Sequence, residues 1–143
     1  MKPKLYATPQ DAEAAFYKAI EKADLEAMMA VWADDEDIVC VHPGGTRLVG
    51  AEHVRESWRA IFASGHTLRF RLLQRQTLSG MSLAVHSVYE HIAVAGEPRT
   101  PAPVIATNIY LRTEHGWRML MHHASPAPSV PDMEADKPGN TLH

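Results

Sequence analysis

The histidine that ends the apolar stretch VCVH, residues 39–42, is the first side chain in this sequence that could do chemistry. Pro43, Gly44 and Gly45 follow, so the chain turns directly after His42. A histidine has a pKa of about 6.5 and can act as a general base close to neutral pH. Two interpretations stay open: His42 transfers a proton at the mouth of a pocket, or it ends a strand and hydrogen-bonds to a turn amide.

Two further histidines, His122 and His123, are adjacent near the end of the predicted sheet. Neighbouring residues of a strand point to opposite faces, so these two cannot act together on one ligand. The more apolar face of this hairpin is expected to meet the helices. Its members are Ile105, Thr107, Ile109, Leu111, Trp117, Met119, Met121 and His123. We therefore predict that His123 and Thr107 point toward a pocket, and that Asn108, Tyr110 and His122 lie on the other face, which is mixed and partly apolar.

Aromatic and polar side chains are candidates for the wall of such a pocket. Trp32 and Trp58 lie on apolar helical stripes, where an indole belongs either to the core or to a pocket rim. His86 lies in the middle of a predicted strand and could line the pocket or an interface. The predicted ligand-binding residues are Phe16, Trp32, Trp58, His86, Thr107 and Met121, with His42 and His123 as the catalytic candidates.

A metal site is not predicted, although the sequence contains nine histidines. It has no H-E-x-x-H motif and a single cysteine, Cys40, so the usual zinc patterns are missing. The acidic run DDED, residues 34–37, is interpreted as a solvated loop. No glycine-rich phosphate loop is present, and no cofactor is expected. Cys40 shares a strand face with His42, but nothing in the sequence supplies a third group to orient a Cys–His nucleophilic pair.

Three helices are predicted in the first half of the chain. Thr8 and Pro9 form a helix start, and apolar residues then recur at helical spacing to about residue 23. Asp24 can cap a second helix, which ends before the acidic run. A third helix is predicted over residues 51–63.

The remaining apolar segments are short or alternate with polar residues, as strands do. The predicted strands are residues 38–42, 46–49, 67–78, 81–95, 104–113 and 117–124. A three-residue loop, residues 114–116, is predicted between the last two. Arg69, Arg71 and Arg75 alternate along one strand and are interpreted as a single solvated or interface face.

This order of elements indicates an α+β fold, in which three N-terminal helices pack on a curved antiparallel sheet that wraps into a cone-shaped α+β barrel. With 143 residues, the chain has the length of one domain. We assign residues 1–125 to this domain. Residues 126–143 are rich in proline and are predicted to be a flexible tail, or an arm lying on a partner.

Composition argues against several classes of function. The formal net charge of −3 gives no basic surface for nucleic acid. No apolar run reaches the roughly 18 residues that span a bilayer, and the first ten residues lack the apolar centre of a signal peptide. A single cysteine fits a reducing compartment. We therefore expect a cytoplasmic protein that binds neither nucleic acid nor membrane.

Three stretches resemble the nuclear transport factor 2-like superfamily: ADLEAMMAVWADDEDIVCVHPGG, LVGAEHVRESWRAIF and ATNIYLRTEHGWRMLMHHAS. Together they span most of residues 8–125. The superfamily includes ketosteroid isomerases, SnoaL-like polyketide cyclases, scytalone dehydratase and the calmodulin-dependent kinase II association domain. The resemblance implies a cone-shaped fold and a homodimer formed through the back of the sheet, with Asn108, Tyr110 and His122 at the interface. It leaves the activity open, because this scaffold hosts enzymes, binding modules and assembly domains.

The ketosteroid isomerase pattern can be tested at three positions, and this sequence departs from it at all of them. Phe16 stands where the resemblance places a tyrosine, although Tyr17 is adjacent. His42 stands where it places an aspartate base. Thr107 or Asn108 stands where it places a protonated aspartate. Steroid isomerisation by that mechanism is therefore not expected.

Two functions remain as hypotheses. The first is a small-molecule-binding or assembly module with an apolar pocket for a small hydrophobic or acidic molecule. The alternative is a small isomerase, cyclase or dehydratase that uses His42 for proton transfer on a hydrophobic carbonyl substrate.

Overall fold

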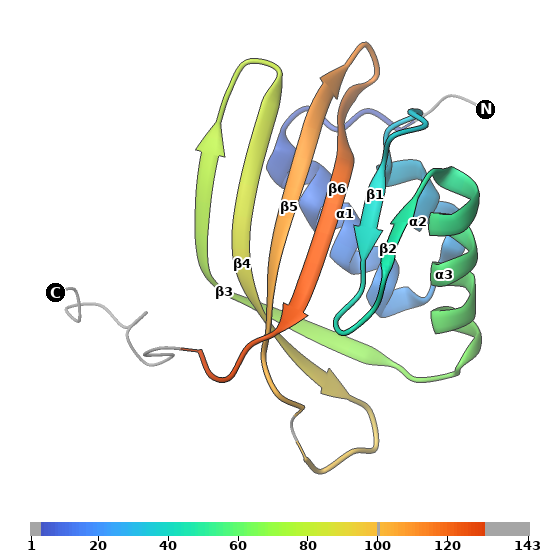
Figure 1. Ribbon diagram of the computed structural model, residues 1–143, viewed down its shortest axis with the longest axis vertical. Helices are drawn as coiled ribbons and strands as arrows, with labels where there is room; N and C mark the ends of the chain where they lie inside the picture. Colours follow the sequence, from blue (N-terminus) through green and yellow to red (C-terminus); the bar gives the residue numbers. More distant parts are fainter. Residues whose placement is uncertain (1–3, 100, 131–143) are drawn as a thin grey trace, which may run out of the picture.

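The computed structural model describes residues 4–99 and 101–130. Within them, the helices are α1 (Pro9–Lys22), α2 (Leu25–Val31) and α3 (Ala51–Ala63). The strands are β1 (Val39–Val41), β2 (Arg47–Val49), β3 (Leu68–Ser79), β4 (Leu83–Val94), β5 (Val104–Thr113) and β6 (Gly116–Pro126). Figure 1 shows α1 lying across the back of the sheet, with α2 and α3 beside it.

Helices α1 and α2 begin where side chains cap them. The hydroxyl of Thr8 accepts a hydrogen bond from the amide of Asp11 (3.0 Å), and the carboxylate of Asp24 accepts one from the amide of Ala27 (3.0 Å). Such caps satisfy amides that have no partner inside the helix. Helix α1 ends at Ala23, whose φ of 50° turns the chain into α2. The predicted starts of both helices are confirmed.

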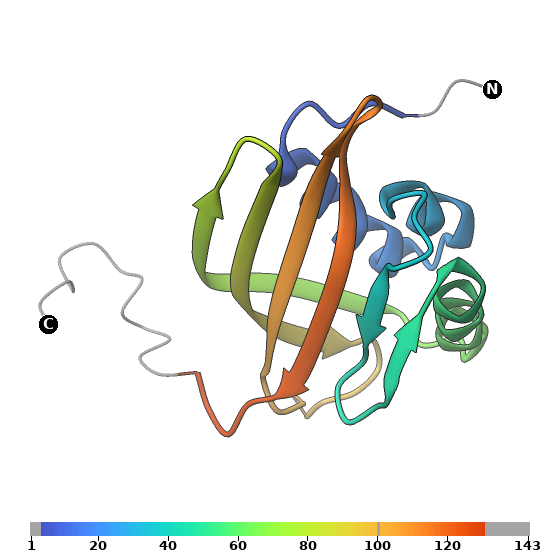
Figure 2. The same cartoon turned by 45° about the horizontal axis from the view of Figure 1, so that its top comes forward.

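The six strands form one sheet in the order β2-β1-β6-β5-β4-β3. Every neighbouring pair is antiparallel except β1 and β6, which are parallel. The α+β class is confirmed, and the one parallel pair is a departure from the antiparallel sheet that we expected. Because β1 and β6 are far apart in the sequence, no hairpin fixes their relative direction. The long strands curve around α1 in both views (Figures 1 and 2).

The core lies between the helices and the sheet face that they cover, called the inner face below. Phe16 is fully buried at its centre. Its ring meets the rings of Tyr17, Trp58 and Trp32 edge-on, at centroid distances of 4.9, 5.7 and 6.4 Å. Edge-to-face pairs of this kind stabilise a fold by about 0.5–1.5 kcal/mol each beyond the area they bury.

The loop between β5 and β6 is shorter than predicted. Thr113 pairs with Gly116, so the loop contains two residues, Glu114 and His115, instead of three. The hydroxyl of Thr113 accepts a hydrogen bond from the amide of His115 (3.0 Å) and donates one to the carbonyl of Gly116 (2.7 Å). Gly116 has a φ of 90°, a conformation that favours glycine.

A bulge in β6 reverses the faces of the strand. Met119 and Met121 have partners in β5, but Leu120 between them has none. An extra residue shifts the alternation of side chains beyond it. Met119 and His122 are therefore both buried, although an unbroken strand would place them on opposite faces.

In β5 the sheet face that meets the helices is the opposite of the predicted one, whereas Trp117 and Met119 of β6 lie on the helix side as predicted. Asn108, Tyr110 and His122 are buried on the inner face. Thr107 and Met121 are half-buried on the outer face, and His123 is exposed there. The prediction ranked the two faces by their hydrophobicity. It failed because the polar side chains of the inner face hydrogen-bond to one another and are buried as a set.

Strand β6 extends to Pro126, and the next residues still contact the fold. The amide of Ala127 donates to the carbonyl of Pro103 (2.9 Å), and Ala127 and Val130 are buried. Most of the predicted tail, residues 131–143, lies outside the described residues. The described helices are all too short or too polar to cross a bilayer.

Candidate functional site

Glu13 of α1 lies at the centre of a polar cluster inside the molecule and is 1% exposed. One oxygen, Oε2, accepts hydrogen bonds from His86 Nδ1 (3.0 Å), Asn108 Nδ2 (3.2 Å) and Tyr110 Oη (2.9 Å). The other, Oε1, forms an ion pair with Arg75 Nε (2.9 Å) whose N–H is not aligned for a hydrogen bond. The cluster thus ties α1 to strands β3, β4 and β5.

The carboxylate of Glu13 is charged at neutral pH despite its burial. Burial alone would raise its pKa, because a charge is poorly solvated inside a protein. The hydrogen bonds from His86, Asn108 and Tyr110, together with the electrostatic attraction of His86, outweigh burial and hold the pKa below its ordinary value. The interior therefore contains a fixed negative charge.

A bulge in β3 brings Arg75 to this charge. The pairing of β3 with β4 shifts between Leu73 and Gln76, and Gln74 has a φ of 52°. Arg69, which precedes the bulge, is exposed on the outer face, whereas Arg75 reaches the buried carboxylate of Glu13. The prediction of one shared arginine face is therefore wrong for Arg75, because the one extra residue of the bulge reverses its side.

A second acid, Glu90 of β4, lies beside the cluster and is 3% exposed. Its Oε2 accepts a hydrogen bond of 2.6 Å from the hydroxyl of Tyr17, which in turn accepts one from Asn108 Nδ2 (3.0 Å). Burial raises the pKa of Glu90 to about 7. The hydrogen bond from Tyr17 acts to lower this pKa, and the nearby charge of Glu13 acts to raise it further. Glu90 therefore exchanges a proton close to neutral pH.

His86, Asn108 and His122 stand side by side on three neighbouring strands of the inner face. His86 pairs directly with Asn108, and Asn108 with His122. Asn108 Oδ1 lies 2.6 Å from His122 Nδ1, so this nitrogen carries the hydrogen of the bond. Complete burial lowers the pKa of His122 to about 3, and the histidine is neutral.

His42 lies at the other side of this row, next to α3. Its Nε2 is 2.9 Å from the hydroxyl oxygen of Ser57, whose own hydrogen is donated to the carbonyl of Val54 (2.8 Å). Nε2 must therefore be the donor, which leaves Nδ1 as the unprotonated nitrogen. Burial lowers the pKa of His42, so its neutral form prevails at neutral pH. The ring of Trp58 meets it edge-on at 4.7 Å.

Nucleophilic chemistry at Cys40 or Ser57 is not supported by these contacts. The sulfur of Cys40 lies 3.7 Å from His42 Nε2, but burial raises the pKa of the thiol to about 12. A thiol that stays protonated is a poor nucleophile. The hydroxyl hydrogen of Ser57 points to Val54, so His42 is not placed to remove it. His42 remains a candidate for proton transfer to a ligand.

The predicted site residues divide into two groups. Phe16, Trp32, Trp58 and His86 are buried on the helix-facing side. His123, Thr107 and Met121 lie on the outer face, so the prediction that they point toward the helices is wrong. The histidine that accompanies His42 inside the molecule is His122: the ring of Trp58 lies 4.7 Å from His42 and 6.3 Å from His122.

Sequence reasoning missed Glu13 and Glu90, although both positions carried a usable signal. Glu13, Tyr17 and Ile20 recur at helical spacing on a buried face of α1. Glu90 shares a strand face with His86, which places two polar residues on one side of β4. Two polar residues repeated on one face of a strand, opposite an asparagine in the next, indicate a buried polar cluster.

A cavity of about 280 Å³ opens where β3 begins and β4 ends. Its lining residues are Ile20, Ile61, Phe62, Ser64, His66, Leu68, Val94 and Glu97. Going inward from the Leu68–Val94 pair, the next inner-face pairs are Phe70–Ile92 and Leu72–Glu90. The ring of Phe70 lies 5.3 Å from that of Tyr17 and occupies the strand position between the cavity and Glu90. The lining of this cavity is thus mostly apolar, and the acid Glu90 lies deeper along the same two strands.

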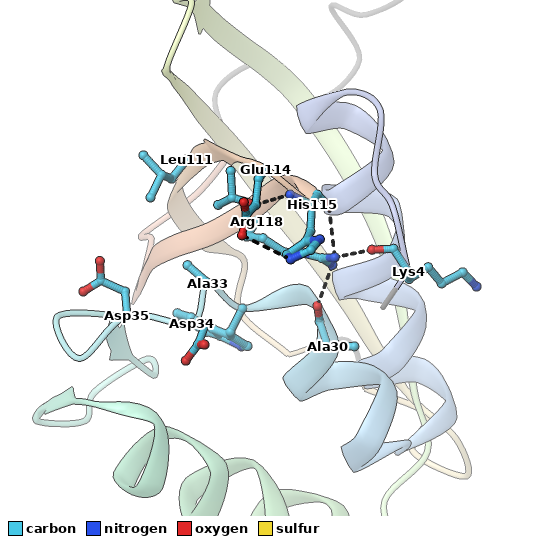
Figure 3. A pocket seen from close by; sticks show the side chains of 11 residues that line it. Lys4, Ala30, Ala33, Asp34, Asp35, Leu111, Glu114, His115 and Arg118 are labelled. Carbon is cyan, nitrogen blue, oxygen red and sulfur yellow. Dashed lines mark hydrogen bonds and ion pairs between the residues drawn. The ribbon is translucent and has the colours of Figure 1, made fainter. Parts of the chain in front are cut away.

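A larger cavity, of about 460 Å³, lies at the opposite end, between the loop of β5 and β6 and the end of α2 (Figure 3). Arg118 in its wall donates hydrogen bonds to the carbonyls of Ala30 (2.8 Å), His115 (3.1 Å) and Lys4. These bonds tie together three backbone segments. Because no member of the polar cluster lines this cavity, we assign Arg118 a structural role. In the part of the chain that the structure describes, no three His, Cys, Asp or Glu side chains are grouped to hold a metal ion.

Two solved structures of known proteins are similar to this chain in sequence and in fold. A protein from Thiobacillus denitrificans, described as a calcium/calmodulin-dependent protein kinase type II association domain, is 35% identical; the match has a TM-score of 0.77 and covers 86% of this chain and 98% of that one. A protein of the NTF2-like family from Streptomyces avermitilis, described as a dehydratase, is 33% identical with a TM-score of 0.75, over 82% and 92% of the two chains.

A plant protein is a more distant relative. The F-box protein SKIP8 of Arabidopsis thaliana is 23% identical over 112 residues, which are 77% of this chain and 46% of that protein. The chain thus spans less than half the length of this curated relative. The model of the SnoaL-like domain family matches residues 10–129. This match and the two similar structures show that the chain belongs to the SnoaL-like domain family of the nuclear transport factor 2-like superfamily.

Proposed function

We propose that the protein binds a small, mostly apolar molecule that carries one carbonyl or hydroxyl oxygen. The molecule enters through the cavity where β3 begins and β4 ends, and its oxygen reaches the hydroxyl of Tyr17 and the carboxyl of Glu90. The observation that carries this proposal is the Tyr17–Glu90 pair, with its 2.6 Å hydrogen bond and a pKa of about 7 on the acid.

Burying the polar cluster costs the fold stability, and this supports a binding role for the cluster. A core of apolar residues would stabilise the fold without burying two carboxyl groups, two histidines and an asparagine. Ionisable groups whose pKa is strongly perturbed gather at functional sites. Small-molecule sites are typically apolar with a few converging polar groups, which is the arrangement from the mouth to Glu90.

Glu90 gives the site its chemical versatility. In its protonated form it can donate a hydrogen bond to a carbonyl, and in its charged form it can accept one from a hydroxyl. Phe70 occupies the strand position between the mouth and Glu90, so entry of a ligand requires this ring to turn aside. A ketone and its alcohol are therefore both suitable ligands.

A pair of probe molecules tests the binding function. 2-Acetonaphthone and 2-ethylnaphthalene share one ring system, and only the first has a carbonyl. We expect the ketone to bind about fivefold more tightly in titrations followed by tryptophan fluorescence, since one hydrogen bond contributes about 1 kcal/mol. Tyr17→Phe and Glu90→Met, which remove the hydroxyl and the carboxyl, should reduce that preference, while Thr107→Val on the outer face should keep it. Equal binding of both probes, or binding of neither, contradicts the proposal.

Proton transfer is a second candidate function, favoured by the neutral imidazole of His42 with its unprotonated Nδ1. The relative from Streptomyces avermitilis is described as a dehydratase, a role that requires such a step. If His42 is a base, the protein should accelerate exchange of the methyl protons of 2-acetonaphthone in deuterated water. His42→Ala should remove the acceleration but keep the binding. If the wild-type protein does not accelerate the exchange, proton transfer is rejected and binding remains as the proposed function.

We further propose that two copies associate through the outer face of the sheet. Ile105, Ile109 and Met121 are half-exposed there, and apolar side chains of this kind form the centre of stable interfaces. The relative described as an association domain supports this assignment. Analytical ultracentrifugation should find a dimer that Ile109→Lys converts to a monomer. A wild-type monomer at micromolar concentration would refute it.

The cytoplasm is the location that we propose for the protein. Its single cysteine, Cys40, is a buried free thiol, which suits a reducing compartment.

A further inference from the structure

A third cavity, of about 240 Å³, is a groove between α1, α2 and the segment that precedes α1. The residues that line it are Lys4, Tyr6, Ala15, Lys18, Ala19, Lys22, Asp24, Ala27 and Ala30. Four of them are alanines of α1 and α2, and their short side chains leave the space between the two helices open. The other side chains make the groove basic.

All three lysines in the described part of the chain, Lys4, Lys18 and Lys22, line this one groove. They are exposed, and none of them forms an ion pair with a carboxylate of the described residues. Lys18 and Lys22 are one turn apart on α1, an arrangement in which like charges repel each other. The whole chain has a net charge of −3, so the groove is a local concentration of positive charge. A bound anion would offset the repulsion.

The segment that carries Lys4 is fixed in place beside the helices. The carbonyl of Lys4 accepts a hydrogen bond from Arg118, and the carbonyl of Tyr6 accepts one from the amide of Trp117 (2.8 Å). The side chain of Lys4 extends away from Arg118 (Figure 3). The other two lysines belong to α1, so the three meet from two separately anchored parts of the fold.

Arg118 adds a buried positive charge behind the wall of the groove. It is 6% exposed, and its guanidinium carbon lies 4.8 Å from the centre of the Tyr6 ring, which lines the groove. Its hydrogen bonds go to backbone carbonyls, and it forms no ion pair within residues 4–99 and 101–130. Buried charges are normally paired, and solvent screens them little. Arg118 therefore favours an anion nearby, independently of the exposed lysines.

The carboxylate of Asp24 is the one acidic group among the described residues that line the groove. Its Oδ1 accepts a hydrogen bond from the amide of Ala27 (3.0 Å), because Asp24 caps α2. Three ammonium groups therefore outnumber one carboxylate, an excess that suits a dianion. A phosphate ester carries about −1.5 to −2 at neutral pH, and lysines bind phosphate as point charges. The groove is smaller than the roughly 300–1,000 Å³ of sites for drug-sized ligands, so its ligand is small.

We propose that this groove binds a small phosphate monoester. The phosphate lies between the ammonium groups of Lys4, Lys18 and Lys22, and the carbon chain lies on the four alanines. The site is separate from the Tyr17–Glu90 pair, so either proposal can fail without the other.

Titration with glycerol 3-phosphate, followed by backbone amide NMR signals, tests the site. We expect saturable shifts at residues 18–22 and 27–30, with a dissociation constant on the order of 1 mM at low salt. Added salt should weaken the binding several-fold, because it screens exposed charges. Glycerol should give no saturable shift, and acetate should bind at least about tenfold more weakly. No saturable shift with glycerol 3-phosphate, or equal shifts with glycerol or acetate, would overturn the proposal.

The location of the shifts separates this groove from the cavity near Arg118, since Lys4 lines both. Shifts at residues 113–115 in place of 18–22 would assign the phosphate to that other cavity and contradict the proposal. Lipids also carry phosphate, so a second arm measures sedimentation with vesicles that contain phosphatidic acid. Binding to the vesicles without binding to glycerol 3-phosphate would contradict a small soluble ligand.

Variants of both signs make the test specific. Lys18→Met and Lys22→Met each remove one ammonium group but keep a good helix former, and each should weaken binding several-fold. Asp24→Asn removes the opposing charge and keeps an equally good cap, so it should tighten binding several-fold, a gain that misfolding cannot imitate.

The control is Arg47→Met, which removes one positive charge at an exposed position outside the groove. It should leave the affinity for glycerol 3-phosphate unchanged. Weakening by Arg47→Met equal to that by Lys18→Met would show that net charge, and not this groove, attracts the phosphate. An unchanged affinity in Asp24→Asn would refute the assignment as well.

Discussion

Glu13 and Glu90 are residues of the same type, 1% and 3% exposed, but they differ in charge. Glu13 receives three hydrogen bonds on one oxygen and an ion pair on the other. The described residues give Glu90 one hydrogen bond, from Tyr17. The pKa of Glu13 lies below its ordinary value, whereas burial raises that of Glu90 to about 7.

The difference shows that the number of hydrogen-bond donors, more than the extent of burial, decides whether a buried acid is charged in this protein. Burial opposes the charge of both groups. Three donors, together with the electrostatic attraction of His86, overcome that opposition at Glu13, and a single phenol does not at Glu90. One acid is therefore a permanent anion that organises the interior, and the other can change its charge near neutral pH.

Removal of Glu13 should have the largest effect on stability. Glu13→Ala leaves His86, Asn108 and Tyr110 without their acceptor and Arg75 without its partner, which should lower the free energy of unfolding by about 3–5 kcal/mol. Urea denaturation at neutral pH measures it. Glu13→Gln, which keeps the shape and one carbonyl acceptor, should lose less. A loss below about 1 kcal/mol for the alanine variant would show that the cluster does not depend on this charge.

The acid Glu90 should make stability depend on pH in the opposite direction to Glu13. Its pKa rises from 4.5 to about 7 on folding. Between these values the folded state holds a proton that the unfolded state has lost, so the free energy of unfolding falls as the pH increases through this range. At about 1.4 kcal/mol per pKa unit, the decrease is about 3 kcal/mol.

Glu90→Gln provides the measurement for that pH dependence. The variant should lack the decline between pH 4.5 and 7 but keep the loss of stability at lower pH that comes from Glu13, whose lowered pKa means that its contribution disappears as the pH falls. Parallel curves for the two proteins would show that Glu90 titrates normally.

Removal of a single donor to Glu13 should have an intermediate effect. Tyr110→Phe deletes one of three hydrogen bonds, at a cost of about 1–2 kcal/mol, and should raise the pKa of Glu13. Thermal unfolding at several pH values detects both changes. Tyr89→Phe, the same chemical change on the half-exposed outer face, is the control and should stay within about 0.5 kcal/mol of wild type.

The smallest effect is expected at Arg75. Its side chain is 41% exposed, so solvent screens its attraction to Glu13, and the three hydrogen bonds to Glu13 stay in place when it is lost. Arg75→Gln should cost about 1 kcal/mol or less at neutral pH, and Arg69→Gln, on the outer face, close to nothing. A loss as large as that of Glu13→Ala would mean that the ion pair, rather than the three donors, keeps Glu13 charged.

Helix positions and the order of strands followed from local rules in the sequence. Thr8 and Asp24 are cap residues before apolar stripes, and both cap helices in the structure. The faces of β3 and β6 beyond their bulges did not follow, because an alternation rule counts every residue and a bulge adds one. Leu120 in β6 and the segment around Gln74 in β3 each add one residue, and each reverses the side of the residues that come next.

The polar cluster could be predicted only in part for a related reason. Hydrophobicity assigns polar side chains to solvent or to an interface, which is how Asn108 and His122 were interpreted. Their burial depends on partners from other segments, and Glu13 and Tyr17 are more than 90 residues away from Asn108 in the chain. A single sequence does not reveal such pairings, and this is why it indicates His42 and Trp58 but not the buried acids Glu13 and Glu90.

The side-chain amide of Asn108 fixes the direction of the hydrogen bonds across the interior. Its amide nitrogen donates to Glu13 and Tyr17, and its oxygen accepts from His122. Turning the amide over would set oxygen against carboxylate and N–H against N–H, so only one orientation is stable. One side of the interior therefore carries the charged carboxylate of Glu13, and the other, toward His42, carries the uncharged imidazoles of His122 and His42. Because the two sides differ in charge, a polar molecule lying between them would be held in one orientation.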